Sequence, residues 1–142
     1  MTPEKRAERC ATLMWEGDRA SQGLGMRLVS VTPGRASVEM PVREDMVNGH
    51  GIGHGGFTFA VADSAFAFAC NSHNFRTVAA ECDIRFLAPT RLGDVLVATA
   101  DERERSGRDG VYDVTVRVGD VLVAEFVGRS RQIRGRFFEE EE

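Results

Sequence analysis

One segment of the sequence, residues 57–70 (FTFAVADSAFAFAC), constrains the fold more than any other because it is apolar on almost every side. Five of its residues are alanines, which favour a helix, and the segment is longer than a typical strand. It is too short for a membrane span, which needs roughly 20 residues, and it contains an acid, Asp63. A helix without a polar face has to be enclosed by other elements. We therefore expect a buried helix from Phe57 to about His73.

The segments around this helix alternate apolar and polar residues with the period of a β-strand. Four of them follow the helix, separated by Gly- or Pro-containing turns and by no helical segment, so the strands should be antiparallel. Two more precede it and meet at Pro33-Gly34, which predicts a β-hairpin. The predicted strands are residues 26–32, 35–42, 77–88, 94–106, 110–119 and 120–134.

The whole chain is expected to form one α+β domain over residues 1–142, in which an antiparallel sheet wraps around the long central helix. Its 142 residues, 42% of them hydrophobic, suit a single domain with one core. Residues 1–23 have the composition of an N-terminal helix, with Pro3 where a first turn could start. Residues 137–142 (FFEEEE) are expected to form a frayed acidic tail.

Charge and cysteine content predict a soluble, cytoplasmic protein. A net charge of -4 argues against a nucleic-acid partner. Cys10, Cys70 and Cys82 have no CxxC spacing, which favours a reducing compartment and a role as small core residues. The charged first ten residues lack the apolar stretch of a signal peptide, so we expect no membrane partner.

The loop before the helix, NGHGIGHGG (residues 48–56), contains two familiar patterns that its context does not support. Gly51 to Gly56 satisfies GxGxxG, but the dinucleotide fold needs a buried parallel strand before this motif and a βαβ unit around it. His50 and His54 have the spacing of a helical zinc site, yet the glycines disfavour a helix there and Gly51 replaces the glutamate of HExxH. We therefore expect neither a metal nor another resident cofactor.

The same loop does offer an anion site. A helix N-terminus presents unpaired N–H groups and a partial positive charge, which can polarise a carbonyl oxygen or hold an oxyanion. Gly55 and Gly56 would let a ligand approach the backbone closely. Asp63 is the second candidate, because a carboxylate in an apolar helix needs hydrogen-bond partners or a wet cavity. The residues leave two roles open for it: a structural acid bonded to Ser64 or Thr58, or an active-site acid.

The spacing of these two candidates sets a geometric condition. If the helix begins near Gly55, Asp63 lies about 12 Å further along its axis. The Gly55 N–H and the Asp63 carboxylate of one chain then cannot reach the same carbonyl carbon. If both are catalytic, a twofold dimer with antiparallel helices would bring Asp63 of one chain beside Gly55 of the other.

At these residues the sequence resembles the hotdog-fold acyl-CoA thioesterases of the phenylacetic-acid-degradation type. The resemblance covers most of the chain, including residues 48–73, FLAPTRLGD (86–94) and GVYDVTV (110–116). It implies an antiparallel sheet curled around a central helix, and hydrolysis of (hydroxy)phenylacetyl-CoA or a related aryl or medium acyl-CoA. It also implies a dimer of dimers with sites between subunits and no cofactor besides the coenzyme A of the substrate.

The resemblance further implies roles for individual residues. Asp63 would act as general base or nucleophile, the Gly55 N–H would polarise the thioester carbonyl, and Asn48 and His54 would orient water, substrate or the loop. Some related thioesterases carry a hydroxyl one turn after the acid, where this chain has Ala67. Ser64 and Thr77 are candidate replacements, and the other expected substrate contacts are Gly56, Phe57, Arg91, Arg129 and Arg131, the arginines because guanidinium suits phosphate.

Two other functions stay open from the sequence. A hydroxyacyl-thioester dehydratase of the same fold would also use a histidine and an acid, although the His54-Gly55-Gly56 context fits thioesterases better. A non-catalytic acyl-CoA sensor would normally need a DNA-binding segment, and the N-terminal region offers none. A Ser-His-Asp triad is not expected, because the sequence has no GxSxG motif.

Overall fold

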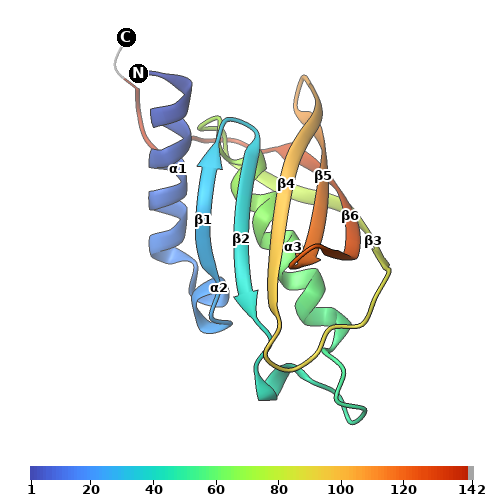
Figure 1. Ribbon diagram of the computed structural model, residues 1–142. Coiled ribbons are helices and arrows are strands. Elements are labelled where there is room, and N and C mark those ends of the chain that lie inside the picture. Colours follow the sequence, from blue (N-terminus) through green and yellow to red (C-terminus); the bar gives the residue numbers. More distant parts are fainter. Residues whose placement is uncertain (141–142) are drawn as a thin grey trace.

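The computed structural model describes residues 1–140, and its centre is the predicted apolar helix, α3 (Gly55–Cys70). The helix lies against one face of a curved sheet and packs on β2, β4 and β5 (Figure 1). His54 caps its N-terminus. Its C-terminus comes earlier than the predicted His73: the Asn71 side-chain amide donates to the Ala67 carbonyl at 2.9 Å, and the Ser72 N–H bonds only three residues back, to the Ala69 carbonyl at 3.3 Å.

The six predicted strands form one antiparallel sheet, which confirms the predicted fold class. The chain begins the sheet with β1 and β2, passes through α3 to the opposite edge for β3, and returns to place β4 beside β2, so the two edges are β1 and β3. The order is β1-β2-β4-β5-β6-β3, with bounds β1 (Arg27–Thr32), β2 (Arg35–Pro41), β3 (Thr77–Phe86), β4 (Val95–Ser106), β5 (Asp109–Val118) and β6 (Val121–Gln132). A single 3-10 turn, η1 (Glu44–Met46), lies between β2 and the glycine loop.

The N-terminal helix predicted over residues 1–23 is two helices, α1 (Pro3–Gly17) and α2 (Arg19–Gly23). The chain breaks at Asp18, whose carboxylate accepts from the Ser21 N–H at 3.0 Å and so starts the second helix. Helix α1 runs beside edge strand β1 (Figure 1). No helix within residues 1–140 is long and apolar enough to span a membrane.

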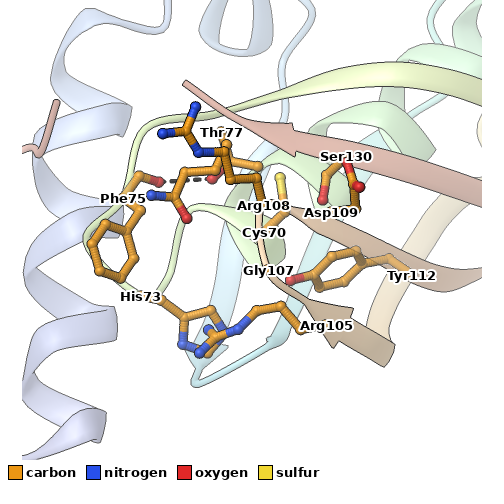
Figure 2. Close-up of a pocket in the computed structure, with 11 residues that line it drawn as sticks. Cys70, His73, Phe75, Thr77, Arg105, Gly107, Arg108, Asp109, Tyr112 and Ser130 are labelled. Carbon is orange, nitrogen blue, oxygen red and sulfur yellow. Dashed lines mark hydrogen bonds between the residues drawn. The ribbon is translucent and has the colours of Figure 1, made fainter. Parts of the chain in front are cut away.

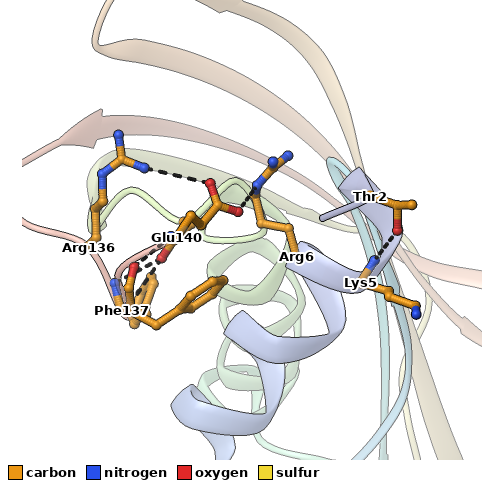
Figure 3. Close-up of polar contacts among 8 residues, drawn as sticks. Thr2, Lys5, Arg6, Arg136, Phe137 and Glu140 are labelled. Carbon is orange, nitrogen blue, oxygen red and sulfur yellow. Dashed lines mark hydrogen bonds and ion pairs between the residues drawn. The ribbon is translucent and has the colours of Figure 1, made fainter. Parts of the chain in front are cut away.

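The prediction of a frayed tail over residues 137–142 is wrong for residues 137–140. Phe138 is only 9% exposed, and the Asn74 side chain accepts from its N–H and donates to its carbonyl, at 3.3 and 2.9 Å. Glu140 bridges Arg6 of α1 and Arg136, at 2.5 and 4.0 Å (Figure 3). Composition alone suggested solvation, but these tertiary contacts hold the segment. Glu141 and Glu142 lie outside the described residues.

Candidate functional site

The glycine loop and the first turn of α3 form one half of the candidate site. His54 Nδ1 accepts from the Gly56 N–H at 3.0 Å, and the His54 N–H donates to the Met46 carbonyl at 2.7 Å. The Gly56 N–H is therefore occupied by the cap rather than open to substrate. The Gly55 N–H has no acceptor within residues 1–140, so it is the donor that this helix end leaves free for a ligand.

Asn48 shapes the loop. Its Oδ1 accepts from the N–H groups of His50 and Ile52, at 2.9 and 3.2 Å, and its own N–H donates to the Ile52 carbonyl at 2.8 Å. The turn between them uses Gly51 at φ 74°, which a side chain would strain. Of the three roles expected for Asn48, these contacts correspond to orienting the loop.

A cavity of about 330 Å³ opens beside the helix end. The Phe86 ring lines it: a Cβ built on Gly55 would lie 3.1 Å from Phe86 Cζ, and Phe86 as a residue is 56% exposed. Glycine at position 55 therefore allows the ring and the backbone to meet. The cavity is lined by Ile52, Gly53, Gly55 and Thr58 from the loop and helix, and by Phe86, Leu87, Ala88, Pro89 and Thr90 after β3.

Asp63 lies midway along α3, half-buried, and its carboxylate has no hydrogen-bond partner within residues 1–140. Neither candidate structural partner holds it, since Ser64 Oγ lies 2.9 Å from Ser21 Oγ and Thr58 lines the cavity. Burial raises the pKa of the Asp63 carboxyl. Burial, with the Asp63 charge second, raises the pKa of Cys82 on β3 to about 11. A half-buried acid without partners has the environment of a reactive group.

The other expected substrate residues lie in several places. Thr77 donates to the Phe75 carbonyl at 2.8 Å and lines a second cavity, at the opposite end of α3 (Figure 2). Arg129 and Arg131 pair with Glu81 and Asp109, at 3.9 and 3.3 Å. Two residues do lie beside the glycine loop: Phe57, whose ring meets the His54 ring edge-on at 6.0 Å, and Arg91, which forms a β-bridge with Ile52.

The second cavity, of about 240 Å³, is lined in part by His73 and Tyr112, which both contact the carboxylate of Glu102. Glu102 Oε1 lies 2.9 Å from His73 Nε2 and accepts from the Tyr112 hydroxyl at 2.9 Å. Burial lowers the pKa of His73. This network joins the end of α3 to β4 and β5. Within residues 1–140 no group of three His, Cys, Asp or Glu side chains could hold a metal ion.

Sequence reasoning missed Phe86 and Thr58 as parts of the site. Phe86 belongs to a strand pattern that marks it only as an apolar residue, and its position over Gly55 depends on how β3 crosses the helix. The sequence pattern indicates Thr58 only as a hydrogen-bond partner for Asp63. The one available signal was its spacing, one helical turn after Gly55.

Comparison with known proteins places this geometry in a family. Residues 50–125 match the family model described as the Thioesterase superfamily. The acyl-coenzyme A thioesterase PaaI of Escherichia coli strain K12 is 44% identical over 126 residues, which cover 88% of this chain and 90% of PaaI.

Solved structures agree with this result. The E. coli PaaI protein from the phenylacetic acid degradation operon superposes with a TM-score of 0.93 at 40% identity, covering 95% of this chain and 99% of that one. A Streptococcus mutans protein bound to acetyl CoA superposes with a TM-score of 0.75 at 26% identity, covering 78% and 90%.

Proposed function

The chain belongs to the Thioesterase superfamily and is an acyl-CoA thioester hydrolase of the PaaI type with the hotdog fold, and we propose that its substrate is (hydroxy)phenylacetyl-CoA or a related aryl or medium acyl-CoA. The observation that carries the proposal is the pair formed by the Gly55 N–H at a helix N-terminus and the half-buried Asp63 carboxylate, neither of which has a hydrogen-bond partner within residues 1–140. The origin of the E. coli relative, a phenylacetic acid degradation operon, supports an aryl-acetyl group.

In the proposed reaction the Gly55 N–H donates to the thioester oxygen and holds it more strongly as it becomes an oxyanion. Asp63 either takes a proton from the attacking water or attacks the carbonyl carbon itself, forming an anhydride that water then cleaves. In both routes the C–S bond breaks and coenzyme A leaves as its thiol. Single turnover in ¹⁸O-labelled water separates them, because only the anhydride route can leave label in the Asp63 carboxylate.

The defining experiment is a thiol-release assay of the purified protein over a panel of acyl-CoAs that includes phenylacetyl-CoA and its ring-hydroxylated forms. We expect turnover, with the highest kcat/KM for the aryl-acetyl substrates. Binding without turnover would favour a sensor instead. Loss of water from a hydroxyacyl-CoA without thiol release would favour a dehydratase.

The pH dependence of kcat should reflect the burial of Asp63. A base or nucleophile has to be ionised, so kcat falls as acid protonates it. Because burial raises the pKa of Asp63, we expect the acid limb at a pH above the ordinary carboxyl value of 3.8. Loss of the thioester ultraviolet absorbance follows the reaction at acid pH. An acid limb at or below 3.8 would contradict the assignment.

The active site is proposed to lie between two subunits, since Gly55 and Asp63 of one chain stand about 12 Å apart along the helix that begins at Gly55. Edge strand β3 offers the surface for a second copy. One side of its backbone has no partner within residues 1–140, and its side chains Val78 and Phe86 are 45% and 56% exposed. An open edge with apolar side chains favours pairing with another strand. Two such dimers would form the proposed tetramer.

Contacts along α3 indicate where the twofold axis of the dimer would pass. Phe86 lies over Gly55, and Thr77 at the other end of β3 donates its N–H to Asn71 at the end of α3, so helix and strand run antiparallel and Cys82 is level with Asp63. In the proposed dimer, Asp63 of each chain lies beside Gly55 of the other. The twofold axis must then pass α3 at the point midway between Gly55 and Asp63. On β3 the midway position between Phe86 and Cys82 is Ile84, so the two β3 strands would pair there.

This register places Asp83 of each chain opposite Arg85 of the other. It predicts that reversing the charge of one residue weakens the dimer and that reversing both restores it. Arg85→Glu would set two carboxylates against each other and should raise the dimer dissociation constant roughly tenfold, with loss of activity at low protein concentration. Asp83→Lys in the same chain should restore both. Light scattering and thiol release measure the two effects. A double variant no better than the single one would exclude this register.

A further inference from the structure

The proposed site has one hydrogen-bond donor for the thioester oxygen, and the structure holds a second unused donor beside it. Thr58 lies one turn after Gly55 in α3 and is only 4% exposed, yet its hydroxyl has no partner within residues 1–140. Every fully hidden side-chain nitrogen or oxygen of those residues has a hydrogen bond. The Thr58 oxygen therefore faces open space, which is the cavity of about 330 Å³ that it lines together with Gly55.

A threonine in a helix normally donates to the carbonyl one turn before it. Thr12 of α1 does so, donating to the Glu8 carbonyl at 3.0 Å. Thr58 makes no such bond to the His54 carbonyl, which instead accepts from the Phe57 N–H at 3.0 Å. Helical side chains lean toward the N-terminus of their helix, so the Thr58 side chain extends over the turn that begins at Gly55.

The other hydroxyls considered for the reaction are engaged elsewhere. Ser64 Oγ lies 2.9 Å from Ser21 Oγ, and Thr77 donates to the Phe75 carbonyl at 2.8 Å. The place one turn after the acid is Ala67, which has no hydroxyl. Thr58 is thus the α3 hydroxyl that both shares a cavity with the free N–H and keeps its proton available.

We propose that the Thr58 hydroxyl donates a hydrogen bond to the thioester carbonyl oxygen alongside the Gly55 N–H. The inference rests on the proposed thioesterase function. When the nucleophile adds to the carbonyl carbon, the π pair of the C=O bond moves onto the oxygen, and both donors then hold a full negative charge. When that pair returns, the C–S bond breaks and its electrons leave with the coenzyme A sulfur, which takes a proton.

The test compares Thr58→Val and Thr58→Ser with the wild-type protein. Valine keeps the shape but removes the donor, and loss of one oxyanion donor should lower kcat about 10²-fold with little change in KM, because the bond strengthens only in the transition state. Serine should restore most of the activity. Valine should leave Tm near the wild-type value, since the Thr58 hydroxyl has no hydrogen-bond partner within residues 1–140 to lose. Thr115→Val, on the outer face of the sheet, is the matched control and should behave as wild type in both assays.

Inhibition by a trifluoromethyl-ketone analogue of the acyl-CoA tests the oxyanion contact directly, because the hydrated or ionised oxygen of the analogue mimics the oxyanion. If Thr58 had only a structural role, its replacement would not change the inhibition constant. The inhibition constant of the analogue should rise in Thr58→Val by about the same factor as kcat falls. Wild-type kcat in Thr58→Val, or equal losses of activity and Tm in both variants, would overturn the role of Thr58. A wild-type protein without thioesterase activity would instead overturn the proposed function, so the two failures are distinguishable.

Discussion

Asp63→Asn should lower kcat for acyl-CoA hydrolysis by about 10²–10⁴-fold, the range in which general acid–base groups contribute. Asparagine has nearly the shape of aspartate but can neither accept the proton of water nor attack the thioester as a carboxylate. The carboxylate has no hydrogen-bond partner within residues 1–140, so its replacement breaks no structural contact. Thiol release under saturating substrate measures the loss.

The same variant should keep or gain thermal stability near neutral pH. Because burial raises the pKa of Asp63, the folded state holds its proton more tightly than the unfolded state, and ionisation above pH 3.8 destabilises the fold. An uncharged side chain removes that penalty. Asp120→Asn, at an exposed turn, is the matched control and should keep wild-type kcat and Tm. If Asp63→Asn lost stability and activity together, Asp63 would be a structural acid.

The fold followed from the sequence because its main signal is local and unambiguous. A helix with no polar face has to be covered, and segments of strand period without intervening helices can cover it only as an antiparallel sheet. Local sequence patterns gave wrong predictions where long-range contacts determine the structure. Asp18 divides the N-terminal helix by capping Ser21, and Asn74 holds Phe138 in a segment that its acidic composition marked as solvated.

The candidate site was predictable in part for the same reason. Gly55 and Asp63 lie on one helix, so helical geometry alone gave their separation, and if both are catalytic that separation calls for a second chain. Thr77 and the arginines of β6 could not be placed this way, because their positions depend on strand register. Arg129 on β6 pairs with Glu81 on the neighbouring strand β3, and Thr77 lies at the opposite end of α3 from Gly55.

Mixing two inactive variants should therefore regain activity. Gly55 is the first residue of α3, a position at which proline fits a helix, so Gly55→Pro removes the N–H donor while keeping the helix start. His54 already has φ -67° and ψ 131°, the extended conformation that a following proline requires. Gly55→Ala, which adds a Cβ against Phe86 but keeps the N–H, separates the loss of the donor from crowding.

When Gly55→Pro and Asp63→Asn chains carrying different tags are unfolded together and refolded in equal amounts, about half of the twofold dimers should contain one of each. In these hybrids one site combines an intact Gly55 with an intact Asp63 from the other chain, and the second site has neither. The mixture should then show about one quarter of wild-type activity, all of it in the doubly tagged fraction. Doubly tagged dimers without activity would place the donor and the acid of each site in the same chain, against the separation that α3 imposes.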